Sequence, residues 1–246
     1  ISDIILMGSE RIHLFDTPLL VSRNMGLAVD QRAAKRVMDI LISGIGIIIT
    51  SPIMLIIATA VKAYDRGPVF YFQDRLTLGG KPFKICKFRS MCVDSEKNGA
   101  RLASKHDSRI TPVGHVLRNL HLDELPQLFN VFKGDMSLVG PRPERESIML
   151  EYEKELPEFY YRLKVKAGLT GYAQVYGKYN TTPYDKLKLD LFYIENYSFL
   201  LDIKLIFMTV KIFFQKEVSE GVDDRQVNAL KDSGKNAGVS ENKTEE

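Results

Sequence analysis

The sequence has few cysteines and none of the common metal-binding or nucleotide-binding motifs. Its 246 residues include only two cysteines, Cys86 and Cys92, which form no CxxC pair. With no signal peptide either, this pattern predicts a reducing compartment and no cysteine-ligated metal site. Walker A, GxGxxG, HExxH, GxSxG and zinc patterns are also missing, so no site of those kinds competes with the one described below.

A strong excess of one charge is missing as well. The net charge is +3, with 45% hydrophobic and 26% charged residues. This charge is too small to indicate a nucleic-acid partner, and we expect none. The length suits one good-sized domain or two small ones. Because the chain opens on Ile1 rather than methionine, we expect it to be a piece of a longer protein.

One long uncharged run is present at residues 40–61, ILISGIGIIITSPIMLIIATAV. About 20 apolar residues are enough to cross a bilayer as a helix. Asp39, at its start, is expected to pair with Lys35 or Arg36. Basic residues flank the run on both sides: Arg32, Lys35 and Arg36 before it, Lys62 and Arg66 after it.

A break is expected inside this run at Ser51-Pro52. Proline removes a backbone donor and kinks a helix, and the hydroxyls of Thr50 and Ser51 can bond to the freed carbonyls. Two arrangements stay open: a kinked helix that crosses the bilayer once, and a re-entrant helix over residues 33–63 that returns to the side it entered. The matched basic flanks favour the re-entrant helix.

The rest of the chain predicts a small, mainly helical α+β domain over residues 64–218. Runs 69–73 and 83–91 are β-rich and joined at Gly79-Gly80, which predicts a hairpin. Thr111 and Pro112 suit an N-cap and first residue of a helix over 112–119. A second helix is expected over 124–133, ended by Gly134.

The C-terminal part is amphipathic and then polar. Charged residues Asp202, Lys204 and Lys211 interrupt its apolar residues, which argues against a second membrane span. A helix lying in the membrane interface and a helix packed on the domain core both fit this pattern. Residues 219–246 are poor in apolar residues and predict a disordered tail.

Two adjacent carboxylates, Asp123 and Glu124, stand just before Pro126 in LRNLHLDELPQLFNVFKGD. At the start of a helix the backbone N–H groups are unpaired, so we expect an ionised carboxylate there with a phosphate held beside it. Arg118 can reach the same place, and a divalent cation would relieve the repulsion between the carboxylates. This arrangement suits a carboxylate nucleophile acting on a phosphoryl group. An acidic N-cap with no catalytic role is the alternative.

Basic residues also cluster in the predicted hairpin: Arg75, Lys81, Lys84, Lys87 and Arg89. They fit either a solvated strand face or a surface for anionic lipid or phosphate.

Taken together, several motifs resemble the bacterial sugar transferases, the monotopic polyprenyl-phosphate phosphoglycosyl transferases. The similar segments, within residues 35–218, are KRVMDI, the Ser-Pro break, FKICKFRSM, LRNLHLDELPQLFNVFKGDMSLVGPRP, KAGLTGYAQVYG and NYSFLLDIKLIF. DELPQLFNVFKGDMSLVGPRP is the most specific of them. Residues 1–32 resemble the junction that precedes the catalytic domain in longer members, among which the galactose-1-phosphate transferases are most similar.

The resemblance implies a two-step reaction at the bacterial inner membrane, with the catalytic domain on the cytoplasmic face. Asp123 would attack the sugar-bearing phosphate of a UDP-sugar, such as UDP-galactose or another UDP-hexose, and release UMP. Undecaprenyl phosphate would then take the phospho-sugar. Mg²⁺ would be held by Asp123 and Glu124, and the break at Ser51-Pro52 would make the membrane helix re-entrant.

The resemblance also implies which cations bind substrate. Arg118 and Arg142 match family arginines and would bind phosphate or nucleotide, with Lys87, Arg89 and Arg75 as further candidates. A non-catalytic membrane scaffold and a phosphate-binding module of the same fold are the alternatives to an enzyme. The sequence leaves the sugar, the polysaccharide pathway and the choice between monomer and homodimer open.

Overall fold

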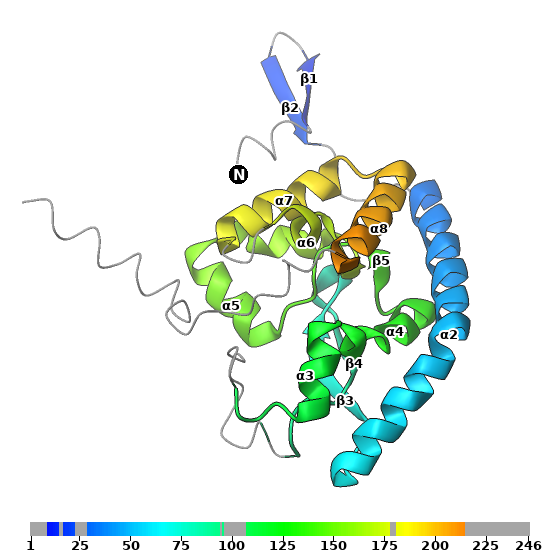
Figure 1. Cartoon of the computed structure of the whole chain (residues 1–246). Coiled ribbons are helices and arrows are strands. Elements are labelled where there is room, and N and C mark those ends of the chain that lie inside the picture. The colour runs from blue at the N-terminus through cyan, green and yellow to red at the C-terminus, as the bar shows by residue number, and fades with distance from the viewer. Residues whose placement is uncertain are drawn as a thin grey trace, which may run out of the picture.

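The computed structural model describes residues 29–93, 95, 107–177 and 181–214, together with the backbone of two strands, β1 (Ser9–Leu14) and β2 (Thr17–Ser22). The predicted polar tail, 219–246, lies outside the described residues, as does half of the predicted junction, 1–32. The other elements, in chain order in Figure 1, are α2 (Val29–Asp65), β3 (Phe70–Leu76), β4 (Pro82–Phe88), α3 (Pro112–Asn119), α4 (Gln127–Lys133), β5 (Ser137–Val139), α5 (Glu146–Glu155), β6 (Gly168–Thr170), α6 (Tyr172–Tyr176), α7 (Pro183–Glu195) and α8 (Phe199–Phe214).

Helices and short strands mix as predicted. The described strands form three two-stranded sheets, of which β1–β2 and β3–β4 are antiparallel and β5–β6 is parallel. In the predicted hairpin Phe70 pairs with Phe88 and Leu76 with Pro82, and Gly79 in the connection has a positive φ of 69°. The predicted hairpin is therefore confirmed, with β3 and β4 starting and ending a few residues from the expected bounds.

The apolar run forms one helix, α2, which is longer than the predicted 33–63 and runs along one side of the molecule (Figure 1). Pro52 lies inside it, and the helical backbone continues across the expected break while the helix axis bends along its course. The Ser51 hydroxyl donates to the carbonyl of Ile48 at 2.8 Å. That carbonyl is the one four residues before Pro52, so the hydroxyl replaces the hydrogen bond that proline cannot make. The predicted role of Ser51 is confirmed.

The middle of α2 is apolar and largely exposed. It is long and apolar enough, by length and composition, to cross a membrane. Ile45, Ile48, Leu55 and Ile56 are 58–74% exposed. Large apolar side chains left open along one helix are typical of a surface that meets lipid or a partner. This helix could therefore anchor the chain to a membrane.

The first turns of α2 are held to the domain by buried polar contacts. Lys35 forms an ion pair with Asp202 of α8 at 2.5 Å. Asp39 accepts hydrogen bonds from the Ser137 hydroxyl (3.0 Å) and the Leu138 N–H (2.9 Å) of β5. Asp39 therefore takes its hydrogen bonds from residues distant in sequence, while the expected partners Lys35 and Arg36 act on it through their charges.

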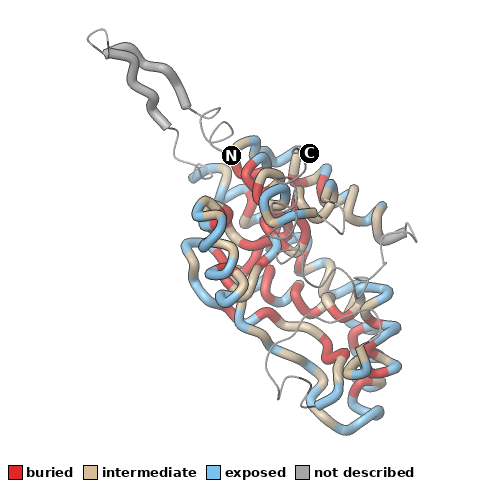
Figure 2. The backbone as a smooth tube through the Cα atoms, turned by 90° about the vertical axis from the view of Figure 1, so that its left-hand side faces the viewer, coloured by how far each residue is buried: buried red, intermediate tan, exposed pale blue. Residues whose placement is uncertain are grey.

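The core lies between the hairpin, β5, α7 and α8. Its fully buried members include Phe159, Leu187, Leu191 and Leu205, and Figure 2 shows the buried segments inside the domain. Leu205 and Asp202 place one face of α8 in this core, while Phe207, on the same helix, is 71% exposed. Core packing thus accounts for one face of α8, and contact of the other face with a membrane stays a prediction.

Helix α3 begins as predicted, because the Thr111 hydroxyl accepts a hydrogen bond from the Gly114 N–H at 2.9 Å. Gly114 lies against the backbone after β4, where an added Cβ would be 1.9 Å from the Ser90 carbonyl oxygen. This close approach sets the position of α3, which carries Arg118.

We expect Gly114→Ala to destabilise the protein by about 1–3 kcal/mol, because the helix must move away from Ser90. For a domain of this size, each 1 kcal/mol lowers the melting temperature by about 2–4 °C. Thermal unfolding of the purified protein measures this. Val116→Ala, at a 57% exposed position of the same helix, is the control and should change little. An unchanged melting temperature in Gly114→Ala would contradict the close packing.

Candidate active site

Asp123 and Glu124 lie in a 3₁₀ turn, η2 (Leu122–Glu124), that joins α3 to α4. His121 precedes this turn in the left-handed conformation, with φ of 53°. Helix α4 begins at Gln127 rather than at Glu124, with Pro126 as its N-cap residue. The acidic pair therefore lies in a separate 3₁₀ turn just before α4, and not at the first residues of the helix as expected. The charges that contact Glu124 are those of side chains.

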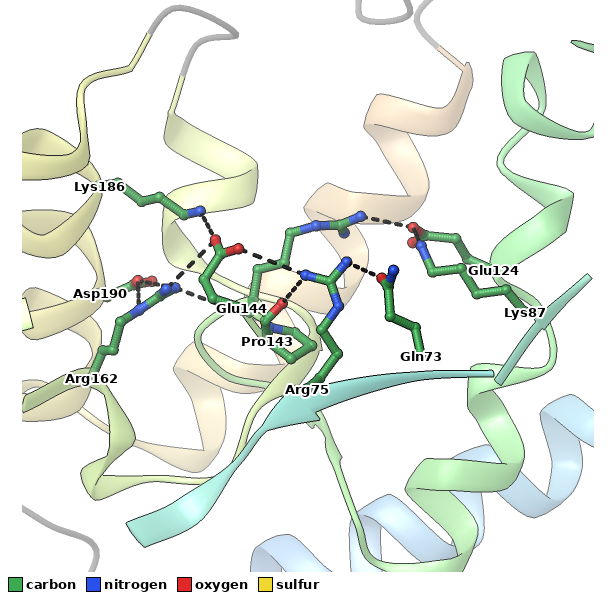
Figure 3. Close-up of polar contacts among 10 residues, drawn as sticks. Gln73, Arg75, Lys87, Glu124, Pro143, Glu144, Arg162, Lys186 and Asp190 are labelled. Carbon is green, nitrogen blue, oxygen red and sulfur yellow. Dashed lines mark hydrogen bonds and ion pairs between the residues drawn. The ribbon is translucent and has the colours of Figure 1, made fainter. Parts of the chain in front are cut away.

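Glu124 is the centre of this site. Its Oε1 atom accepts from the Lys87 Nζ at 2.7 Å and from the Arg142 Nη2 at 2.7 Å (Figure 3). Burial alone would raise the pKa of Glu124, but Arg142 and Lys87 outweigh it and hold this pKa well below its ordinary value. Glu124 is thus ionised at neutral pH and draws a lysine of β4 and an arginine of the loop after β5 to one point.

Asp123 is more buried, with 9% of its surface exposed. Burial raises its pKa, Lys87 and Arg118 lower it, and the neighbouring charge of Glu124 raises it further. A carboxylate held partly away from water is less stabilised by solvation and is a better nucleophile than an exposed one. Asp123 is therefore a buried carboxylate under competing charges, and not a solvated helix cap.

The other candidate cations go to different places. The Arg118 Nε donates to the Ser90 hydroxyl at 2.8 Å, and its charge acts on Asp123. Arg89 forms an ion pair with Asp65, at the end of α2, so the structure does not bring it to the acidic pair. Both ends of α2 are in this way attached to the same domain.

Arg75 is also directed away from Glu124. Its Nη2 donates to the Gln73 side chain at 2.5 Å, and its Nη1 donates to the backbone carbonyl of Pro143 at 3.1 Å. It therefore contacts the loop that carries Arg142 rather than the carboxylates themselves (Figure 3).

A second charged group beside the site was not predicted. Glu144, Arg162, Lys186 and Asp190 form a network of ion pairs, in which Arg162 and Asp190 are each no more than 2% exposed (Figure 3). In the sequence these residues look like ordinary charges of amphipathic helices. Nothing in their spacing indicates that they share one buried site, because they come from three separate elements.

The acidic pair is the place where the sequence predicted a metal ion. The part of the chain that the structure describes holds no group of three or more His, Cys, Asp or Glu suited to a metal ion. Both cations on Glu124 contact Oε1, and no hydrogen bond to its Oε2 occurs among the described residues. Mg²⁺ commonly takes only one or two carboxylates, with water and substrate phosphates completing its shell. Asp123 and Glu124 fit a site of that kind, in which the protein supplies two carboxylates.

Comparisons with known proteins agree on one family. The family described as bacterial sugar transferase matches residues 30–216. A UDP-N-acetylgalactosamine-undecaprenyl-phosphate N-acetylgalactosaminephosphotransferase of Aeromonas hydrophila is 46% identical over 180 residues, which cover 72% of this chain and 43% of that protein. A UDP-glucose:undecaprenyl-phosphate glucose-1-phosphate transferase of Klebsiella pneumoniae is 44% identical over 208 residues, which cover 82% and 43%.

A shorter relative is covered more fully. A UDP-glucose:undecaprenyl-phosphate glucose-1-phosphate transferase of Caulobacter vibrioides is 38% identical over 203 residues, which cover 79% of this chain and 75% of that protein. The chain spans less than half the length of the Aeromonas and Klebsiella relatives. Because the family match extends over most of its length, the chain belongs to the bacterial sugar transferase family.

Proposed function

We propose that this chain transfers a sugar 1-phosphate from a UDP-sugar to undecaprenyl phosphate and releases UMP. The observation that carries the proposal is the position of buried Asp123 beside Glu124, which Lys87 and Arg142 both contact. A nucleophile beside convergent cations suits attack on a diphosphate. The names of the relatives support the same reaction class.

The proposed reaction has two displacements at one phosphorus atom. A carboxylate oxygen of Asp123 attacks the phosphorus that bears the sugar, the bond to the bridging oxygen breaks, and UMP leaves with that oxygen. A phosphate oxygen of undecaprenyl phosphate then attacks the same phosphorus and displaces the carboxylate. The products are undecaprenyl-diphospho-sugar and the regenerated enzyme.

Each cation has a separate task in this proposal. Arg142, whose side chain is 43% exposed, can contact substrate phosphate while it neutralises Glu124. Lys87 lowers the pKa of Asp123, against the effect of burial, and so favours the ionised form of the nucleophile. Mg²⁺, when bound by Asp123 and Glu124, would supply positive charge to the leaving phosphate. The remaining ligands of that ion would come from substrate and water.

We also propose that α2 is re-entrant and that the domain lies on the cytoplasmic face of the inner membrane. Lys35 pairs with Asp202 near one end of α2, and Asp65 pairs with Arg89 at the other. A helix with both ends attached to one folded body has both ends on the same side of the bilayer. Cysteines introduced at Arg32 and at Arg66 should thus both react with a membrane-impermeant thiol reagent that is added to one side of the membrane. Labelling of the two cysteines from opposite sides would contradict the proposal.

The function is tested by UMP release from a panel of UDP-sugars, with undecaprenyl phosphate and Mg²⁺ in nanodiscs. The panel should include UDP-galactose, UDP-glucose and UDP-N-acetylgalactosamine, because the relatives' names differ in the sugar. We expect UMP release with at least one sugar and its loss on chelation of Mg²⁺. Release with no sugar would favour a non-catalytic scaffold or phosphate-binding module.

A further inference from the structure

The loop that carries Arg142 is held by its backbone carbonyls. Four successive carbonyls, of residues 141 to 144, each accept a hydrogen bond from outside the loop. The outer two accept from backbone N–H groups, Gly168 to Pro141 at 2.9 Å and Leu76 to Glu144 at 3.0 Å. The loop is thus fixed at both ends by ordinary strand-edge contacts.

The inner two carbonyls accept from arginine side chains instead. The Arg162 Nη2 donates to the carbonyl of Arg142 at 3.0 Å, and the Arg75 Nη1 donates to that of Pro143 at 3.1 Å. The Arg142 carbonyl belongs to the peptide that follows Arg142, and the Pro143 carbonyl belongs to the next peptide, so the two contacts hold the backbone from which the Arg142 side chain leaves. Figure 3 shows Pro143 and Glu144 between the two arginines.

Arg162 is itself held firmly. It is 2% exposed, and its Nε and Nη2 donate to one oxygen of Asp190, at 3.1 and 2.8 Å. Glu144 Oε1 lies 3.6 Å from its Nη1, and Lys186 also pairs with Glu144. A guanidinium can donate to several acceptors in fixed directions at once, which an ammonium on a flexible stem cannot do. The network thus gives the loop a rigid support.

We propose that Arg162 and Arg75 are positioning residues, which clamp the carbonyls of Arg142 and Pro143 so that the Arg142 guanidinium meets Glu124 and the substrate phosphate. Neither arginine contacts the acidic pair. This inference rests on the proposed function, because the clamp acts on catalysis only through Arg142. We call the two residues the arginine clamp.

The test is a double-mutant cycle in kcat/KM for UMP release by the full 246-residue chain in nanodiscs. Arg162→Lys keeps the charge but loses the multiple donors, and we expect kcat/KM to fall about 10- to 100-fold, as for other residues that orient a catalytic group. In an Arg142→Ala background the same substitution should lower kcat/KM no more than about threefold further, because the group that it positions is absent.

A merely structural role gives a different result. Loss of folded enzyme lowers the apparent kcat, leaves KM unchanged, and lowers the rate by the same factor in both backgrounds. Multiplicative effects of Arg162→Lys and Arg142→Ala would therefore overturn the clamp. We expect instead that the loss of kcat/KM in Arg162→Lys is divided between kcat and KM in the same way as the loss in Arg142→Ala.

Arg75→Lys is the second variant, since it removes the neighbouring contact from a different element. If Arg162→Lys does not fold, Arg75→Lys takes its place in the double-mutant cycle. We expect its effect on kcat/KM to be similarly small in the Arg142→Ala background. Lys164→Ala, on the same 3₁₀ segment as Arg162 (Pro157–Lys164), is the matched control, because Lys164 contacts the Tyr161 ring and not the loop. A wild-type protein that releases no UMP would overturn the proposed function, whereas multiplicative effects in an active protein would overturn only the clamp.

Discussion

Asp123→Asn is expected to lower UMP release by at least about a thousandfold, because the amide cannot form the acyl phosphate and removal of a nucleophile costs a factor of this order or more. Rates of UMP release with the preferred UDP-sugar measure the loss. Mass spectrometry of the wild-type protein mixed with that sugar should show a phospho-sugar adduct on Asp123, absent from the variant.

The same substitution should keep or raise the melting temperature. Burial raises the pKa of Asp123, so the ionised group costs folding free energy at neutral pH, and that cost disappears as the pH falls below the raised pKa. The uncharged amide removes this cost. Asp74→Asn, at an exposed position of β3, is the control and should keep its activity. Release that persists in Asp123→Asn would refute the nucleophile assignment.

Glu124→Gln is expected to lower kcat/KM on the order of 100-fold, because its amide no longer attracts Lys87 and Arg142 to one point. It should also destabilise the protein. Loss of one partner from a fully buried ion pair costs about 3–5 kcal/mol. The Lys87 and Arg142 side chains keep 21% and 43% exposure, so water screens the pairs and we expect a smaller loss, about 1–2 kcal/mol. Thermal unfolding and steady-state kinetics measure the two effects.

Glu124→Gln should also change the pH dependence in a defined direction. In the wild type, UMP release should fall on the acid side at a pH above the ordinary aspartate pKa of 3.8, because burial raises the pKa of Asp123 and the nucleophile must be ionised. The charge of Glu124 adds to that shift. Its removal should move the acid limb of the residual activity to lower pH. A limb that moves to higher pH would contradict the electrostatic coupling of the two carboxylates.

Local signals in the sequence predicted the elements around the site well. The Thr111-Pro112 start of α3, the Gly79-Gly80 turn and the Gly134 end of α4 are all observed close to their expected residues. Each depends on the backbone preferences of neighbouring residues, and these preferences do not depend on the tertiary structure. The start of α4 was wrong because the tight turn at His121 forms a separate 3₁₀ segment before Pro126.

The roles of the basic residues could not be predicted in this way. Lys87 and Arg89 are two apart, and on one continuous strand they would share a face. Strand β4 ends at Phe88, so only Lys87 reaches Glu124, while Arg89 turns to Asp65. Arg162, which the sequence did not indicate, contacts the Arg142 carbonyl across 20 residues of chain.

The sequence alone was therefore enough to identify the acidic pair, the apolar helix with its Ser-Pro step, the hairpin and the family, because each of these depends on residues that are adjacent along the chain. The tertiary structure alone decided which cations meet Glu124, that Asp123 is buried, and that two arginines hold the loop of Arg142. Those outcomes depend on distances between side chains from different elements, which the order of residues along the chain does not specify.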